Sequence, residues 1–194
     1  MLAAMADVPR EHFVPEGVRQ SAYNDSALPI GHEQTISQPW VVAAICEALR
    51  LKGDESLLEI GTGSGYSAAV LARLARSVIS VERVPELGEG ARRKLEELGI
   101  ENVEVIVGDG SRGHPSGAPY DAIAVHAATP EAPHSLLAEL ATDGRLVVPI
   151  ATGTADLLTA FVRENGNLRQ ETIGPCRFVP LIGAEGFNPP EGSQ

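Results

Sequence analysis

Three glycines at alternate positions interrupt residues 57–74, LLEIGTGSGYSAAVLARL. The apolar run before them and the helical spacing after them are typical of a strand–turn–helix unit, in which a ligand approaches the backbone at the helix N-terminus. Gly61, Gly63 and Gly65 form G-x-G-x-G, so the G-x-G-x-x-G of dinucleotide sites is not matched, and no G-x-x-x-x-G-K-[ST] phosphate loop is found. Three such glycines exceed the needs of one tight turn, so we expect a ligand-binding loop.

Glu59 stands two residues before the first glycine of this loop. Its carboxylate would repel a pyrophosphate and would favour a cationic ligand that carries an amino group. S-adenosylmethionine is a ligand of that kind. We therefore expect Glu59 and the three glycines to form part of a site for S-adenosylmethionine, and we expect NAD not to bind.

Short apolar runs alternate with amphipathic segments from Ser56 onward, which is the βαβ rhythm of a parallel sheet. Strands are expected near 56–60, 77–81, 102–107, 120–125 and 144–149, and helices near 65–76, 85–98 and 132–140. Asn165-Gly166, between two β-like runs, indicates a type I′ hairpin. The predicted fold class is therefore α/β, with a doubly wound, mostly parallel sheet that ends in an antiparallel hairpin.

The first part of the chain lies outside this rhythm. It contains a stretch rich in turn formers and then a helix that is expected to run from Pro39 to about Leu51. We expect residues 1–55 to form an N-terminal segment on the substrate side, 56–183 to form the main domain, and 184–194, which is polar and contains prolines, to form a flexible tail.

Composition excludes several classes of function. The 15 Lys and Arg residues against 26 Asp and Glu residues give a net charge of −11, which opposes the phosphate neutralisation that nucleic-acid binding requires. No apolar run approaches the ~20 residues of a membrane span, and the first residues do not resemble a secretory signal. We expect a soluble, cytoplasmic protein without nucleic-acid or membrane partners. Cys46 and Cys176 are isolated and are expected to be packing residues, so neither a disulfide nor a metal site is indicated.

Acidic residues follow the second and third expected strands as well as the first. Glu82 lies 21 residues beyond Gly61, near the spacing at which a carboxylate accepts hydrogen bonds from ribose hydroxyls. Asp109, followed by Gly110, could accept from an adenine amino group. Each acid alone could be a solvated strand end. Because ligands bind across the carboxyl ends of such strands, their combination with the glycine loop favours a cofactor site.

Three longer motifs carry a family resemblance. Residues 28–39 (LPIGHEQTISQP), 58–70 (LEIGTGSGYSAAV) and 108–121 (GDGSRGHPSGAPYD) together resemble the protein-L-isoaspartate O-methyltransferases. The likeness continues through 122–128, 143–150 and 177–181, and it covers most of residues 7–181.

This resemblance implies a class I methyltransferase (Rossmann-like) fold and transfer of a methyl group from S-adenosylmethionine to the α-carboxylate of L-isoaspartyl residues, a protein-repair reaction. The implied partners are isoaspartyl-containing peptides and proteins, and we expect a monomer. By position, Ser37 matches the active-site serine. The implied cofactor contacts are Thr35, Ile36, Glu59, Gly61, Gly63, Gly65, Glu82, Arg83, Asp109 and Gly110. The expected substrate contacts are Ser37, His126, Arg177, Phe178 and Val179.

Two departures from the family pattern leave an alternative open. His126 stands where the family usually has a small residue or threonine; at the end of the fourth strand it could touch the substrate or be an exposed loop residue. Asp156 stands where glutamine or asparagine is common, which leaves cofactor contacts from that loop in question. The alternative is a methyltransferase that acts on an aspartate of a dedicated biosynthetic precursor peptide. A catalytically silent module is disfavoured because the TISQP and glycine-loop motifs are intact.

The reaction implied here needs no strong general base, because a carboxylate with a pKa near 4 is already ionised at neutral pH. An enzyme can instead supply alignment and exclusion of water. Ser37 could donate one hydrogen bond to the substrate carboxylate. Its alternative role is to cap the helix that is expected to begin at Pro39; the residues alone favour the cap, and the family resemblance favours the substrate role. Near Arg177, the extended main chain of 177–181 could pair with a peptide as an added strand.

Overall fold

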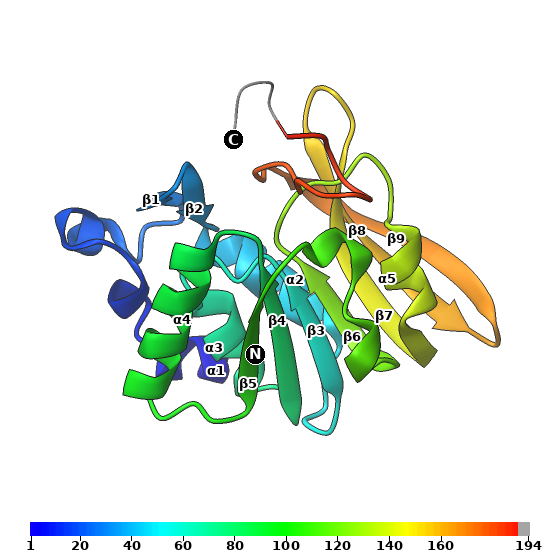
Figure 1. The fold of residues 1–194 in the computed structure, drawn as a ribbon, viewed down its shortest axis with the longest axis horizontal. Coiled ribbons are helices and arrows are strands. Elements are labelled where there is room, and N and C mark those ends of the chain that lie inside the picture. The colour runs from blue at the N-terminus through cyan, green and yellow to red at the C-terminus, as the bar shows by residue number, and fades with distance from the viewer. Residues whose placement is uncertain (190–194) are drawn as a thin grey trace.

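The computed structural model describes residues 1–189 and has a seven-stranded sheet at its centre (Figure 1). The strand order is β5-β4-β3-β6-β7-β8-β9. The strands are β3 (Ser56–Ile60), β4 (Ser77–Glu82), β5 (Val103–Val107), β6 (Tyr120–Val125), β7 (Leu140–Ala151), β8 (Asp156–Glu164) and β9 (Asn167–Cys176). The first five in the sheet order pair in parallel, whereas β8 and β9 pair antiparallel. The predicted α/β fold with a C-terminal antiparallel hairpin is confirmed.

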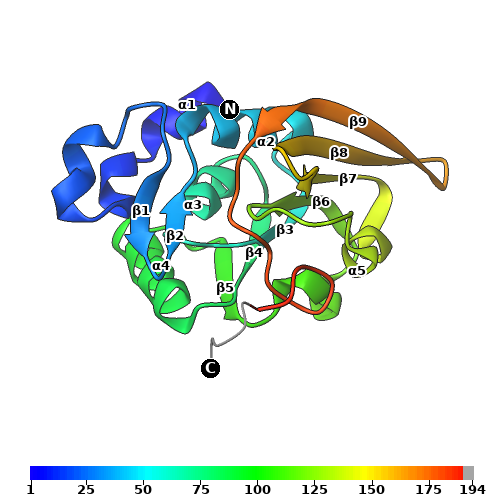
Figure 2. The same ribbon diagram turned by 90° about the horizontal axis from the view of Figure 1, so that it is seen from above.

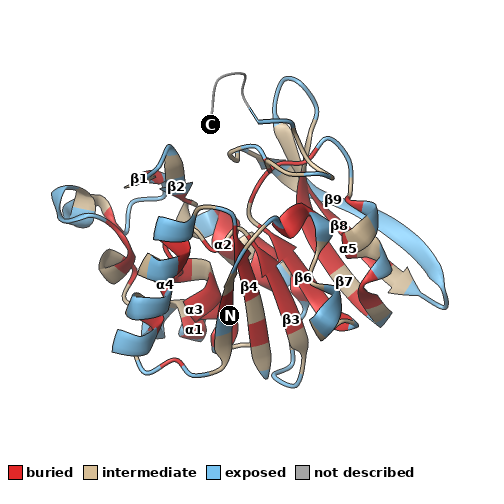
Figure 3. Cartoon of the chain, viewed as in Figure 1, coloured by how far each residue is buried: buried red, intermediate tan, exposed pale blue. Residues whose placement is uncertain are grey.

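Helices cover both faces of the parallel part of the sheet (Figure 2). They are α1 (Leu2–Asp7), α2 (Pro39–Leu49), α3 (Tyr66–Ala72), α4 (Pro85–Glu97) and α5 (His134–Ala138). Successive strand residues face opposite sides, so Leu57 joins the apolar cluster under α2 and α3, and Leu58 joins the cluster that contains Leu136 of α5. Both faces of the central strands are therefore buried, whereas β9 is mostly exposed (Figure 3).

The topological switch point lies at β3. From β3 the chain passes to β4 and β5 on one side and then returns to β6 on the other side. The carboxyl ends of β3, β4 and β6 therefore open a crevice, which is where ligands bind in folds of this kind. The loops that follow these three strands carry the glycine motif, Glu82 and His126.

Local signals explain several element ends. Pro39 and Pro85 occupy the first helical positions of α2 and α4, as predicted. Asn165 and Gly166 have φ angles of 52° and 79°, which agrees with the predicted type I′ turn between β8 and β9. The helix expected at 65–76 is shorter in the structure, where it is α3. The helix expected at 132–140 is also shorter and is α5, because β7 already begins at Leu140 rather than near residue 144.

The N-terminal part contains a hairpin that was not predicted. β1 (Leu28–Gly31) and β2 (Gln34–Ile36) pair antiparallel around His32 and Glu33, whose φ angles are 51° and 59°. Short 3₁₀ helices precede the hairpin at Arg10–Phe13 and Glu16–Ser21, and two more follow β5 at Gly110–Arg112 and Pro115–Gly117. A turn between non-glycine residues with positive φ gives little sequence signal. This hairpin leads directly into the TISQP motif.

Hydrogen bonds connect part of the expected tail to the domain. Ala184 N–H donates to Asp109 Oδ2 at 2.9 Å, and Ser135 N–H donates to Glu185 Oε2 at 2.9 Å. Residues 190–194, the end of the expected tail, lie outside the described residues. Among residues 1–189, no helix has the length and apolar character needed to cross a membrane.

Candidate active site

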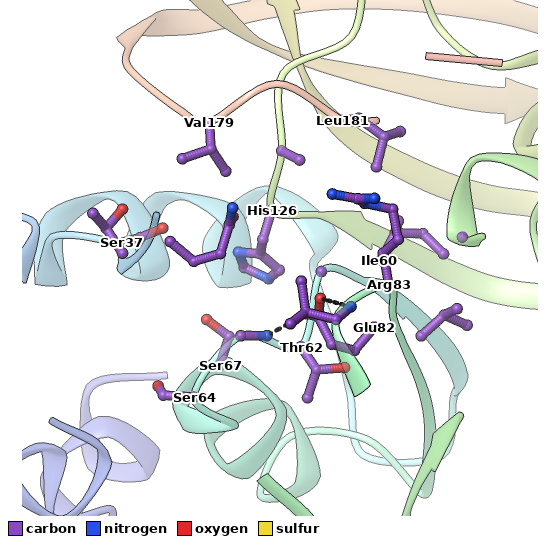
Figure 4. A pocket seen from close by; sticks show the side chains of 18 of the residues that line it. Ser37, Ile60, Thr62, Ser64, Ser67, Glu82, Arg83, His126, Val179 and Leu181 are labelled. Atoms are coloured by element: carbon purple, nitrogen blue, oxygen red, sulfur yellow. Dashed lines mark hydrogen bonds between the residues drawn. The ribbon is translucent and has the colours of Figure 1, made fainter. Parts of the chain in front are cut away.

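A cavity opens at the carboxyl ends of β3, β4 and β6 (Figure 4). It contains about 800 Å³ of space between protein atoms, part of it open to solvent. Its wall includes the expected residues Thr35, Ile36, Ser37, Gly61, Gly63, Glu82, Arg83, Gly110, His126 and Val179. Thus most of the residues that were predicted from sequence are brought together.

The glycine loop forms one wall because its backbone is left-handed. Gly61, Gly63 and Gly65 have φ angles of 92°, 54° and 92°, a conformation that side-chain-bearing residues rarely adopt. A Cβ atom on Gly61 would lie 3.5 Å from that of His126. Gly65 is not in the cavity wall; a Cβ there would lie 3.1 Å from the Cβ of Ala91 in α4, so it allows close helix packing. Gly61 and Gly63 provide the cradle, and Gly65 supports it.

Glu82 fastens this loop from the end of β4. Its Oε2 accepts a hydrogen bond from Gly63 N–H at 2.8 Å, and its Oε1 accepts one from Val84 N–H at 2.9 Å. Only 6% of the residue is exposed, yet it lies in the cavity wall. Each oxygen retains acceptor capacity, which suits a vicinal pair of ligand hydroxyls. Arg83, the next residue, is exposed at the rim (Figure 4).

Glu59 lies behind the cavity wall rather than in it. It is completely buried, and its Oε2 accepts a hydrogen bond from Ser80 Oγ at 2.5 Å. Burial raises the pKa of Glu59 to about 8, and the Ser80 hydrogen bond only partly opposes this effect. From the sequence, Glu59 was expected to contact the cofactor. Because the residue is buried behind the wall, such a contact would need the wall to open, and Glu59 is instead a buried residue beside the cavity.

His126 contacts Glu59 from the end of β6. Its Nε2 lies 3.3 Å from Glu59 Oε1, and 6% of the side chain is exposed. Burial lowers the pKa of His126 to about 4, so both groups are neutral near pH 7 and the contact is not an ion pair. The sequence left two possibilities for His126, a substrate contact or an exposed loop residue. Its burial excludes the exposed loop residue.

Asp109 is not part of the cavity wall. Its Oδ1 accepts from Ser111 N–H and its Oδ2 accepts from Ala184 N–H, both at 2.9 Å. Burial opposes ionisation of this group, but these hydrogen bonds outweigh it and lower the pKa of Asp109. Gly110 does line the cavity, and a Cβ on it would lie 2.7 Å from Ile60 Cγ2. The loop thus approaches the site through its glycine backbone.

A smaller cavity of about 320 Å³ adjoins the first one. The two cavities share Thr35, Ser37, His126 and Val179. Arg177 and Phe178 line only the smaller cavity, so the residues predicted for the substrate lie together on that side. Phe178 N–H donates to Asp156 Oδ2 at 2.8 Å, so Asp156 holds the segment that carries Phe178 and Val179. This structural role of Asp156 was not predicted.

Ser37 stands at the junction of the two cavities and does not cap α2. The N-cap residue of α2 is Gln38, and no side-chain hydrogen bond from that residue closes the helix. Instead, the main-chain N–H of Trp40 donates to Asp25 Oδ1 at 2.9 Å. A distant aspartate therefore performs the capping function that was the alternative interpretation of Ser37. The hydroxyl of Ser37 remains available to a ligand.

Arg10 supports this junction and was missed in the sequence. The residue is 1% exposed; its Nη2 donates to Ser37 O at 2.8 Å, and its Nε donates to Ala22 O at 2.7 Å. The guanidinium also lies 4.9 Å from the ring centroid of Tyr66, the first residue of α3. Burial lowers the pKa of Arg10 from its usual value. A buried arginine between the TISQP loop and the glycine-loop helix could not be recognised from local sequence.

Comparison with known families and proteins agrees with this geometry. The sequence model of the family described as "Protein-L-isoaspartate(D-aspartate) O-methyltransferase (PCMT)" matches residues 1–186. Protein-L-isoaspartate O-methyltransferase 1 of Rhodopseudomonas palustris (strain HaA2) is 55% identical over 189 residues, which are 96% of this chain and 77% of that protein. Protein-L-isoaspartate O-methyltransferase 2 of Pelobacter propionicus is 52% identical and covers 96% of this chain and 84% of the relative.

Solved structures give the same result. A protein-L-isoaspartate O-methyltransferase structure superposes with a TM-score of 0.87 at 33% identity and covers 95% of this chain; this chain spans 61% of that longer one. A Plasmodium falciparum protein of the same description, solved with S-adenosyl-L-homocysteine, has a TM-score of 0.79 at 25% identity and covers 93% of this chain and 88% of that one. The chain belongs to the protein-L-isoaspartate (D-aspartate) O-methyltransferase family.

Proposed function

We propose that this chain transfers the methyl group of S-adenosylmethionine to the α-carboxylate of L-isoaspartyl residues in damaged proteins or peptides. The observation that carries the proposal is the junction of two cavities at Ser37 and His126. One cavity has the glycine loop and Glu82 in its wall, which suits the cofactor. The other has Arg177, Phe178 and Val179, which suits an anionic peptide.

The cofactor side divides into backbone and side-chain roles. The glycine loop, with Gly61 and Gly63 in the wall, would accept the methionine part closely, and Glu82 would accept hydrogen bonds from the ribose hydroxyls. Arg83, Gly110, Thr35 and Ile36 would complete the enclosure. Gly65, Asp109 and Glu59 would act through the loops that they support.

The peptide side supplies alignment. The substrate carboxylate is ionised at neutral pH, so no residue has to remove a proton from it. Ser37 O–H would donate one hydrogen bond to that carboxylate and would aim it at the methyl group in the adjacent cavity. Arg177 at the rim would attract the anion, and the wall formed by Phe178, Val179 and His126 would exclude water. When bound, S-adenosylmethionine supplies the electrophilic methyl group.

The decisive assay uses paired peptides that differ only in an isoaspartyl or aspartyl linkage. Base-labile methyl ester should form with the isoaspartyl peptide and not with its partner. Calorimetric titration of S-adenosylmethionine and NAD on the same preparation should detect only the former. Esterification of a particular aspartyl peptide in place of the isoaspartyl one would instead support the dedicated-precursor alternative. The family relatives give no support to that alternative.

Ser37→Ala should lower kcat/KM for an isoaspartyl peptide by about tenfold or more, which corresponds to ~1.4 kcal/mol per tenfold. Affinity for S-adenosylhomocysteine and the melting temperature should stay near those of the unchanged protein, because Ser37 makes no capping hydrogen bond. Asp25→Ala is the matched control. It should reduce the free energy of unfolding by ~0.5–2 kcal/mol through loss of the α2 cap. Full activity in Ser37→Ala would remove the serine from the proposed site.

The monomeric state and the cytoplasmic location remain predictions. Gel filtration with light scattering would measure the first.

A further inference from the structure

A row of buried polar groups lies between two points on the wall of the larger cavity. Thr62 Oγ1 lies 2.5 Å from Ser80 Oγ, Ser80 Oγ donates to Glu59 Oε2 at 2.5 Å, and Glu59 Oε1 lies 3.3 Å from His126 Nε2. Thr62 and His126, the two ends, both line the cavity. The carboxyl group of Glu59 is therefore hidden from solvent but linked to the cavity through hydroxyl groups.

No cation neutralises Glu59 among residues 1–189. The groups that face it are the hydroxyl of Ser80, the neutral imidazole of His126, the carboxyl of Glu82 and, from α2, the thiol of Cys46. Burial is the largest effect that disfavours its charged form, and repulsion by Glu82 acts in the same direction. Glu59 Oε1 and both ring nitrogens of His126 have no hydrogen-bond partner among the described residues, so the 3.3 Å contact between Glu59 and His126 does not compensate a charge on the carboxyl group. An uncompensated carboxylate at this position would be costly.

A positive charge in the cavity would change this balance. The residues that follow Glu59 in the chain, Ile60, Gly61 and Thr62, are themselves part of the cavity wall. A cation held against them would lie on the other side of one layer of protein from Glu59, with little water between to screen the interaction. S-adenosylmethionine carries a sulfonium charge, and its demethylated product does not. The two ligands are otherwise alike in their amino, carboxylate and nucleoside groups.

We infer that Glu59 is a neutral carboxylic acid in the free protein, that it releases its proton when S-adenosylmethionine binds, and that it thereby distinguishes this cofactor from S-adenosylhomocysteine. The O–H bond of the acid breaks, its electron pair stays on the carboxylate, and the buffer takes up the proton. After methyl transfer the sulfonium becomes a neutral thioether, so Glu59 takes up a proton again and the electrostatic attraction for the product is lost. Glu59 is thus a specificity-determining residue that does not have to touch the cofactor.

The inference rests on the proposed function, in which S-adenosylmethionine is the cofactor. Calorimetry tests the binding of this cofactor and the release of the proton separately. Binding is measured near pH 7 in phosphate and in Tris, whose ionisation enthalpies differ, so that the difference in heat counts protons released. S-adenosylmethionine should release more protons than S-adenosylhomocysteine, and the ratio of its affinity to that of S-adenosylhomocysteine should increase with pH by up to about tenfold per unit. Absence of S-adenosylmethionine binding would contradict the proposed function. Binding with equal proton release for the two ligands would contradict only the inference.

Glu59→Gln should abolish the difference in proton release between the two ligands. Glu139→Gln is the matched control, because Glu139 is a second buried carboxyl with a raised pKa, caused by burial, but contacts His114 N–H and does not line the cavity. That control should keep the full difference. Undiminished release in Glu59→Gln would overturn the assignment.

Infrared difference spectroscopy provides a readout on the unmodified protein and so does not depend on the folding of any variant. Addition of S-adenosylmethionine should remove the carbonyl band of one protonated carboxylic acid, and addition of S-adenosylhomocysteine should leave that band in place. Persistence of the band with both ligands would overturn the inference.

Discussion

Replacement of Arg10 by methionine is expected to lower the free energy of unfolding by about 2–6 kcal/mol. Methionine fills much of the same space but leaves the buried carbonyl of Ala22 and the partly buried carbonyl of Ser37 without their donors, and a buried group without a partner costs ~1–3 kcal/mol. The contact with the ring of Tyr66 is also lost. Urea denaturation at constant pH measures the effect. Arg73→Met, at an exposed position of the α3 C-terminus, is the control and should change stability little.

The same variant tests whether Arg10 positions Ser37. In the surviving folded Arg10→Met protein, KM for an isoaspartyl peptide should rise more than the dissociation constant of S-adenosylhomocysteine, because Arg10 holds the Ser37 carbonyl directly. Arg10→Lys retains the charge but not the fork of donors, so it should recover only part of the stability. An unaltered KM at reduced stability would make Arg10 a purely structural residue.

Sequence reasoning was most successful where the backbone itself demands a residue type. The positive φ angles of Gly61 and Gly63 and the turn at Asn165-Gly166 require residues that tolerate the left-handed region, so these residues mark their positions in the sequence. Glu82 was found because strand ends in a parallel sheet fall on one edge at regular spacing. Each of these signals is local or periodic.

Other parts of the site depend on contacts between distant residues. Asp25 caps α2 through Trp40 N–H, and Asp156 holds Phe178 N–H across 22 positions of the chain. Neither spacing is fixed by a periodic element, so sequence reasoning considered only Ser37 for the cap, as the alternative to its substrate role, and left Asp156 without a role. Tertiary hydrogen bonds of this kind become visible only when the fold brings the partners together.

Glu59 illustrates a third case, in which the residue was noticed for a sound reason but its environment differs. The acid beside the glycine loop was expected to face a cationic ligand. Because strand residues alternate between the two faces of the sheet, the side chain of Glu59 instead lies beside Ser80 and His126 inside the protein. Its effect on a ligand must then be exerted through its protonation state rather than by contact.

Glu82→Ala is expected to weaken the binding of S-adenosylhomocysteine by ~1–3 kcal/mol, or about 5- to 150-fold in the dissociation constant. The carboxylate has two tasks that act together. It would accept hydrogen bonds from the ribose hydroxyls, and it already holds the N–H groups of Gly63 and Val84. Its removal therefore loses a ligand contact and loosens the loop that contains the other contacts.

Comparison of Glu82→Ala with Glu82→Gln separates these two tasks. Glutamine retains one oxygen acceptor, but its NH₂ group would face a main-chain N–H, so the loop should be held less well and binding should be intermediate. Glu86→Ala, an exposed acid in the first turn of α4, removes the same charge without touching the cavity and should leave the dissociation constant unchanged. Titration calorimetry and thermal melting on each variant are sufficient. A lowered melting temperature with an unchanged dissociation constant would make Glu82 a fastener of the glycine loop and would assign the ribose to another residue.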